Sequence, residues 1–300
     1  MKPEAHWAKQ CTSFFAGDFP TAREHAEIGL LHYDRAASIE FMKITQQGCG
    51  PLMTSFLGQT LWKLGYPDQG LARMKESIEM CLDLKHPFTQ TVIEWEFGQY
   101  YDFSRLGDEA LEQGRRTCKL ADELAFVWYA ALGLGCQGDG LRRLGRFEEA
   151  IPLLQQCLAT TKMVGAKCTL GKYAGSLAEA LWHTGRREEA WKSLDEAFEH
   201  IQCGERHIEA ELLRYRGDFH VDLGDLEKAE AAYRESLAVC ARQHAKCYEL
   251  RTTIRLSRLW AQRGQRTAAH AELSKIYNWF TEGFWQPDFI EAQRLLAEWA

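Results

Sequence analysis

The chain has 300 residues, of which 46% are hydrophobic and 26% are charged, which is enough to bury a large core and unlike a disordered protein. Its 36 basic and 42 acidic residues give a formal net charge of -6, which disfavours a nucleic-acid-binding protein. The N-terminus leads into an amphipathic pattern without the apolar stretch of a signal peptide or membrane span. Ten cysteines are scattered singly. Together these features predict a cytoplasmic protein that does not bind membranes and keeps its thiols reduced.

A short turn followed by a helix start recurs along the chain at intervals close to 40 residues. The turns fall at Gly17, Gly65, Arg105, Gly145, Gly185, Gly224 and Gly264. Five residues after each turn the side chain is tiny, at Ala22, Gly70, Ala110, Ala150, Ala190, Ala229 and Ala269. Seven residues before it, small residues recur as Gly58, Gly98, Gly138, Ala178, Gly217 and Ser257, with Gln10 as the exception. Two antiparallel helices that approach closely require such small side chains at the crossing.

This pattern is typical of tetratricopeptide-like repeats with helices about one turn longer than usual, since the common unit has about 34 residues. We therefore predict an all-α fold, a right-handed α-solenoid that forms one domain over residues 1–300. The predicted hairpins are 3–34, 50–84, 88–124, 127–164, 168–202, 206–243 and 246–280. A loop inserted at 34–51 and a C-terminal capping helix at 288–300 complete the chain.

Five segments carry a resemblance to a known family: 64–69, 86–88, 204–206, 209–217 and 277–284. They resemble the C-terminal tetratricopeptide region of bacterial signalling proteins that contain an NTPase domain, often with a class III adenylate or guanylate cyclase domain. The resemblance implies a regulatory arm similar to the repeat region of maltose-regulator-like activators, where a ligand or partner sets the state of the NTPase. The chain itself has no G-x-x-x-x-G-K-[ST] phosphate loop and no room for a cyclase domain, and Trp285-Gln286-Pro287 departs from the family's short polar turn.

In tetratricopeptide stacks the first helix of each pair lines the concave surface. Residues ten, six, three and two positions before each turn face inward and form a mixed-charge groove with three tryptophans. These residues are Gln59, Trp62, Lys63, Trp95, Gln99, Asp102, Asp139, Arg142, Arg143, Glu179, Trp182, His183, Arg214, Asp218, Asp222 and Arg258. Tryptophan and arginine often anchor interfaces, and an arginine pair can hold a carboxylate or phosphate. The alternative is a solvated face with half-buried tryptophans.

Other chemistry has weaker support in the sequence. Residues 133–138 match G-x-G-x-x-G but follow no strand, as a dinucleotide site would require. Two trios, His200, Cys203 and His207, and Cys240, His244 and Cys247, have soft ligands near one another, but each offers only three ligands, so packing is favoured over a metal site. No nucleophile elbow or other catalytic signature is present.

The sequence thus predicts a non-catalytic protein-interaction or sensor module, without cofactor or metal, that serves a signalling NTPase or cyclase. The alternatives are a small-molecule receptor that uses the groove and, more weakly, a metal-dependent enzyme. Aromatic residues near the C-terminus, Trp279, Phe280, Phe284, Trp285 and Trp299, suit either a cap on the stack or an oligomer formed through the terminal repeat.

Overall fold

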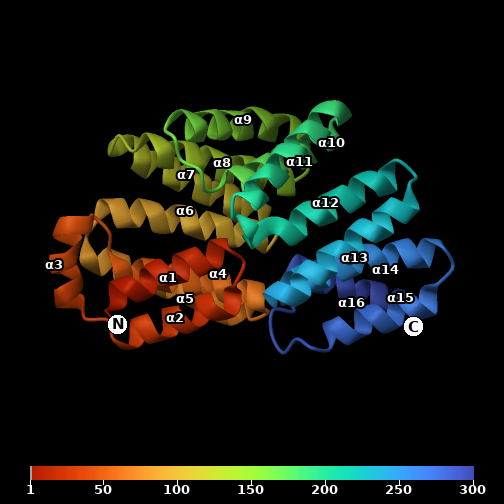
Figure 1. Ribbon diagram of the computed structural model, residues 1–300, viewed down its shortest axis with the longest axis horizontal. Coiled ribbons are helices and arrows are strands. Elements are labelled where there is room, and N and C mark those ends of the chain that lie inside the picture. The colour runs from red at the N-terminus through yellow and green to blue at the C-terminus, as the bar shows by residue number, and fades with distance from the viewer. Residues whose placement is uncertain (1) are drawn as a thin grey trace.

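The computed structural model describes residues 2–300, and within this range the chain is helical with no strand (Figure 1). The predicted all-α solenoid is confirmed. Seven antiparallel pairs follow one another: α1 (Pro3–Phe15) with α2 (Phe19–Leu31), α4 (Cys49–Leu64) with α5 (Pro67–Leu84), α6 (Pro87–Phe103) with α7 (Gly107–Glu123), α8 (Val127–Arg143) with α9 (Phe147–Met163), α10 (Leu170–His183) with α11 (Arg187–Gln202), α12 (Glu209–Asp222) with α13 (Leu226–Gln243), and α14 (Lys246–Gln262) with α15 (Arg266–Tyr277). A short 3-10 helix, η1 (Arg206–Ile208), precedes α12, and α16 (Pro287–Trp299) ends the chain.

The turn between paired helices ends the first helix with a left-handed residue. Gly145 has φ +75°, its N–H donates to Arg142 O at 3.1 Å, and the next N–H, of Arg146, donates to Leu141 O at 2.9 Å. This pair of bonds satisfies carbonyls that the helix end would leave unpaired, and glycine adopts the conformation without strain. Arg105 occupies the same place with φ +60°, where a side chain is unfavourable.

The small residues of the repeat lie where two helices cross. A Cβ on Gly58 would lie 2.8 Å from Gly70 O, and a Cβ on Gly70 would lie 2.7 Å from Gly58 O. Ala150 and Ala190 are fully buried. The predicted close approach of the helices is confirmed, and it explains why the sequence repeats small residues on both sides of each turn.

The insertion between the first two pairs is not a loop throughout. Helix α3 (Arg35–Thr45) occupies most of it, with Asp34 accepting a hydrogen bond from Ala37 N at 2.7 Å as its N-cap. The helix ends at Gln46, which has φ +58°, and α4 begins at Cys49. The prediction of a loop over 34–51 was wrong because Gln46-Gln47-Gly48 alone forms the break, while Asp34 supplies a helix start.

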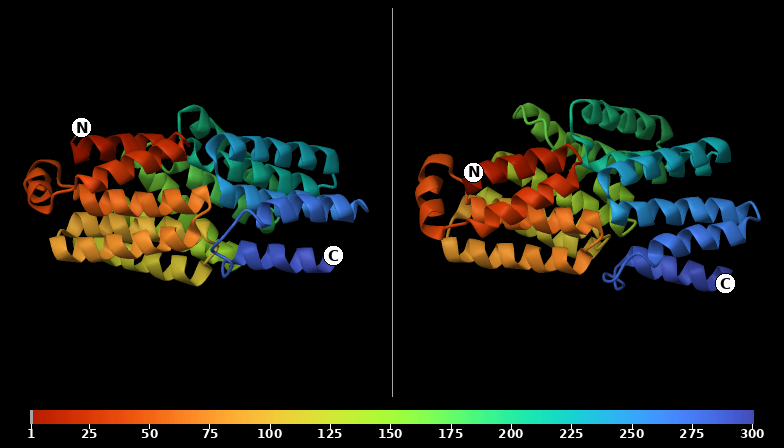
Figure 2. Two further views of the ribbon diagram at one scale, coloured as in Figure 1. Left: turned by 90° about the horizontal axis from the view of Figure 1, so that it is seen from below. Right: turned by 60° about the horizontal axis from the view of Figure 1, so that its bottom comes forward.

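The superhelix closes on itself, so that its second and third hairpins meet the C-terminal segment (Figures 1 and 2). Trp62 Nε1 donates to Gln286 Oε1 at 3.0 Å, and Glu282 Oε1 accepts from the backbone N–H groups of Asp68 and Gln69 at the start of α5, at 2.9 and 3.1 Å. A carboxylate is favourable at a helix N-terminus. We refer to residues 278–291 as the C-terminal clasp.

Arg105 belongs to this closure. Its Nη1 lies 2.7 Å from Asp288 Oδ1 and 3.0 Å from Glu291 Oε2, both in α16. The guanidinium therefore compensates for the unfavourable backbone conformation at the one turn of the series that lacks glycine. Trp279, Phe284 and Trp285 of the clasp keep exposed surface, whereas Phe280 is buried. None of the helices within residues 2–300 is both long and apolar enough to cross a membrane.

Candidate functional site: a closed polar interior and one open cavity

Closure of the superhelix divides the predicted groove into two parts. Ten of its sixteen residues are buried, namely Gln59, Trp62, Lys63, Trp95, Gln99, Asp102, Asp139, Arg142, Trp182 and Arg214. Arg143, Glu179, Asp218 and Arg258 are half-buried, and His183 and Asp222 are exposed. The inner wall is thus largely a closed polar interior in the second, third and fourth hairpins, and it opens to solvent at residues of α10, α12 and α14.

Arg142 is the centre of an ion-pair network in this interior. Its Nη2 lies 2.7 Å from Asp102 Oδ1 and 3.3 Å from Asp139 Oδ1, and its Nη1 pairs with Glu179. Burial raises the pKa of the Glu179 carboxyl, but Arg142 and Arg143 outweigh it and lower this pKa to about 2. The network therefore holds charged groups from α6, α8 and α10 together.

A second network continues along the same wall. Arg251 Nη1 lies 2.8 Å from Glu211 Oε2, and Arg251 Nη2 lies 2.7 Å from Asp288 Oδ2. Arg251 Nη2 also donates to Phe103 O at 2.5 Å. This network joins α6, α12 and α14 to α16, so the buried charges run from the third hairpin to the C-terminus.

Three charged residues of these networks were missed by the sequence analysis: Glu211, Arg251 and Lys172, whose ammonium group pairs with Asp102 and Asp139. Lys172, Glu211 and Arg251 lie thirteen positions before their turns, an offset we had not assigned to the inner wall. The first units place Leu52, Val92 and Leu132 there, so the offset looks like ordinary core. The change from apolar to charged residues at one repeat position was the available signal.

Lys63 is fully buried and has no carboxylate partner among residues 2–300. Its Nζ donates to Tyr248 OH at 2.7 Å and lies 3.7 Å from the ring centroid of Phe103 and 4.4 Å from that of Tyr248. Burial lowers the pKa of this ammonium well below its ordinary value, because the aromatic surroundings replace only part of its hydration.

This burial predicts a pH-dependent stability. Between the lowered pKa of Lys63 in the folded state and the ordinary pKa of about 10.4 in the unfolded state, the unfolded chain binds more protons, so the free energy of unfolding rises with pH. Substituting Lys63→Met with Tyr248→Phe removes both hydrogen-bonding partners. We expect it to raise the free energy of unfolding by about 1–4 kcal/mol at pH 7 and by less as the pH approaches 10.

Urea denaturation at several pH values between 5 and 10 measures this effect. Lys192→Met, at an exposed position of α11, is the control and is expected to change the free energy of unfolding by no more than about 0.5 kcal/mol. An unchanged pH slope in the double variant would contradict the prediction.

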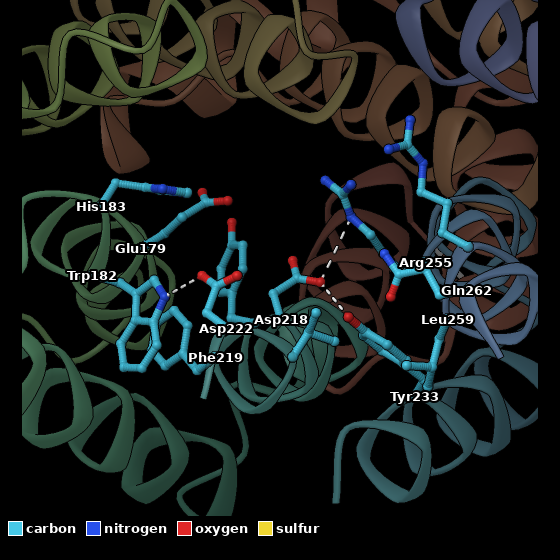
Figure 3. Close-up of a pocket in the computed structure, with 13 residues that line it drawn as sticks. Glu179, Trp182, His183, Asp218, Phe219, Asp222, Tyr233, Arg255, Leu259 and Gln262 are labelled. Atoms are coloured by element: carbon cyan, nitrogen blue, oxygen red, sulfur yellow. Dashed lines mark hydrogen bonds and ion pairs between the residues drawn. The ribbon is translucent and has the colours of Figure 1, made fainter. Parts of the chain in front are cut away.

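The open part of the wall is a cavity of about 240 Å³ between α10, α12 and α14 (Figure 3). Six predicted groove residues line it: Glu179, Trp182, His183, Asp218, Asp222 and Arg258. Tyr215, Phe219, Val221, Tyr233, Arg255, Leu259 and Gln262 complete the lining. These seven residues were not among the predicted groove residues, because most of them lie at repeat positions that also supply core side chains.

The cavity wall is held by contacts that leave little freedom to its aromatic residues. The Trp182 indole stacks on Phe219 with ring centroids 4.1 Å apart and donates from Nε1 to Asp222 Oδ2 at 2.7 Å. Tyr233 OH donates to Asp218 Oδ1 at 2.6 Å. A ligand that enters the cavity meets a largely preformed surface.

The two cysteine and histidine trios do not converge. His207 is buried and packs with its ring 5.3 Å from Phe14 and 5.2 Å from Phe15, while Cys203 is exposed. Cys240 and Cys247 are buried, whereas His244 is exposed. Within residues 2–300 no three His, Cys, Asp or Glu side chains are arranged to hold a metal ion. The glycines of 133–138 lie inside α8 and pack against neighbouring helices.

These features define the class of fold: an all-α solenoid of tetratricopeptide-like helix pairs. Models of the tetratricopeptide repeat family match residues 137–164, 173–190 and 216–242. No curated protein is similar in sequence.

Two solved structures share the fold over nearly the whole chain. A Rap protein complexed with competence and sporulation factor matches with a TM-score of 0.59 and 9% identity, covering 99% of this chain and 97% of its own. The apo form of RapI matches with a TM-score of 0.55 and 14% identity, covering 99% and 100%. At these identities the likeness concerns the fold.

Proposed function

We propose that this chain is a non-catalytic regulatory module that binds another molecule at the cavity between α10, α12 and α14. The observation that supports the proposal is the division of the inner wall. Elsewhere most charged side chains pair with one another in a closed interior, whereas at the cavity His183 and Asp222 are exposed and Arg255 and Arg258 are half-buried. Preformed concave sites of this kind are the usual places of recognition on a rigid scaffold.

The partner we propose is a signalling NTPase or nucleotide cyclase. The resemblance of segments 64–69, 209–217 and 277–284 to the repeat arms of such proteins supports this choice. A similar fold occurs in a Rap protein complexed with competence and sporulation factor, so a solenoid of this shape is compatible with binding a regulatory partner.

Binding to the NTPase and cyclase proteins encoded nearest to its gene tests the proposal. Asp222→Ala and Arg258→Ala are expected to weaken binding by about tenfold or more, because each removes a charged contact at the cavity. Lys119→Ala, at an exposed position of α7, is the matched control and should bind like the wild type. If none of these proteins binds, the proposed partner class is wrong; if all variants bind equally, the cavity is not the binding site.

A second candidate function is a small-molecule receptor that uses the same cavity. The volume of about 240 Å³ favours it, because this space holds only a small ligand rather than a folded partner. A ligand that binds only the folded state raises the melting temperature with its concentration. A module that binds only a partner protein shows no such shift with small molecules. Thermal unfolding in the presence of candidate ligands therefore distinguishes the two functions.

A further inference from the structure

We infer that the cavity binds a small zwitterion, of the class of free α-amino acids and dipeptides, with its ammonium group at Asp222 and its carboxylate at Arg255 and Arg258. The inference rests on the receptor form of the proposed function. It follows from how charge is distributed around the cavity, from the apolar lining between the charged groups, and from the cavity's size.

The α12 edge of the cavity has an uncompensated negative charge. Asp218 is paired with Arg214, whose Nη1 lies 2.5 Å from Asp218 Oδ2, and Glu179 is paired with Arg142. Asp222 receives only the neutral indole N–H of Trp182 and forms no ion pair within residues 2–300. Asp222 is an exposed residue, so its carboxylate can pair with a ligand ammonium.

The α14 edge has guanidinium groups that are incompletely paired. Glu291 lies 2.7 Å from Arg258 Nη2 and is shared with Arg105, which also pairs with Asp288. Arg255 has no carboxylate at hydrogen-bonding distance within residues 2–300, because Asp218 Oδ1 lies 3.6 Å from its Nε and Glu291 Oε1 lies 4.0 Å from its Nη1. This edge therefore favours a ligand carboxylate, which arginine binds well.

Between the two edges the cavity is lined by apolar and aromatic side chains, including Phe219, Val221 and Leu259. Figure 3 shows Asp222 and His183 on one side of the space and Arg255 on the other. A cavity of about 240 Å³ is large enough to hold several water molecules. A free amino acid or dipeptide matches this size and can contact both edges, whereas a singly charged ligand leaves one of them unpaired.

Calorimetric titration of the wild-type chain with the twenty amino acids and a set of dipeptides tests the inference, with the N-acetyl and C-terminal amide derivatives of each binder as probes of the two charges. We expect at least one zwitterion to bind and each derivative to bind about tenfold more weakly or worse. Asp222→Asn should weaken binding of the zwitterion but leave binding of its N-acetyl derivative unchanged. Arg258→Gln should weaken binding of the zwitterion but leave binding of its amide derivative unchanged.

Asp222 is exposed and Arg258 is half-buried. The melting temperatures of the two variants without ligand test whether they fold. The inference is overturned if no zwitterion binds at millimolar concentration or if the derivatives bind as well as the parent. It is also overturned if Asp222→Asn and Arg258→Gln reduce the affinity for all ligands equally. The proposed regulatory function then still stands if the two substitutions abolish binding of a partner protein. The proposed regulatory function fails separately if neither the binding of small zwitterions nor the binding of partner proteins depends on these residues.

Discussion

Replacing Arg142 by alanine is expected to lower the free energy of unfolding by about 3–5 kcal/mol, because it removes the cation that three carboxylates share. Asp102 and Asp139 keep only the ion pairs with Arg143 and Lys172, and Glu179 keeps none within residues 2–300. Asp102 and Asp139 both depend on its Nη2, at 2.7 and 3.3 Å, and Glu179 pairs with its Nη1. Tyr215 OH, which accepts from Nη1 at 3.2 Å, also loses a partner. Urea denaturation at pH 7 measures the loss.

The pH dependence supplies a second readout for this variant. The pKa of Glu179 is lowered to about 2, so the wild-type chain loses the contribution of this carboxylate only as the pH falls from about 5 toward 2. Without Arg142 that acid-range loss should shrink, since the folded-state pKa moves back toward its ordinary value.

The control for Arg142→Ala is Arg186→Ala, because the Arg186–Glu189 pair has similar geometry at 2.6 Å but is exposed. Exposed pairs contribute about 0–1 kcal/mol. A loss in Arg142→Ala no larger than in Arg186→Ala would show that the interior is hydrated and that the closed polar wall is not dry.

Replacing Gly140 by valine is expected to lower the free energy of unfolding by about 3 kcal/mol or more, because helices α7 and α8 touch there through their backbones. A Cβ at Gly140 would lie 2.5 Å from Leu111 N and 2.8 Å from Gly107 O. Backbone atoms cannot rotate aside as a side-chain end can, so the helices must separate. A Cβ at Gly114 would likewise lie 2.7 Å from Gly133 O in α8.

Alanine at the same position gives a sharper test. In an exposed helix, Gly→Ala raises stability by about 1 kcal/mol through helix propensity. Gly140→Ala should nevertheless be destabilising. Gly29→Ala is the matched control, because its Cβ would meet only side-chain atoms, Met53 Sδ at 2.6 Å and His6 Cβ at 3.0 Å, and it should cost less stability than Gly140→Ala. Denaturant unfolding of the three variants decides the matter, and a stabilised Gly140→Ala would refute the backbone contact.

The closed superhelix connects the cavity to the C-terminal clasp. The clasp joins Glu282 and Gln286 to the second hairpin, and Glu291 connects it to Arg105 and to the cavity arginines Arg255 and Arg258. The ligand carboxylate that we propose would compete with Glu291 for these guanidinium groups.

The sequence by itself determined the helices and their pairing. Small residues at Gly58 and Gly70, or at Gly138 and Ala150, are local requirements of a helix crossing, and a turn glycine such as Gly145 is a local requirement of the backbone. Such requirements repeat every 40 residues and can be read without knowing the fold. The insertion was mispredicted because α3 belongs to no repeat and rests on its own cap at Asp34.

Only the tertiary structure decided which inward-facing residues remain accessible. Lys63 and Asp222 occupy the same position of their repeats, two before the turn, yet Lys63 is fully buried against Tyr248 and Asp222 is exposed. The difference arises because the superhelix brings residues about 185 positions apart into contact at one end and leaves the other end open. Contacts between distant repeats depend on the summed rotation of all the units between them, which no single repeat encodes.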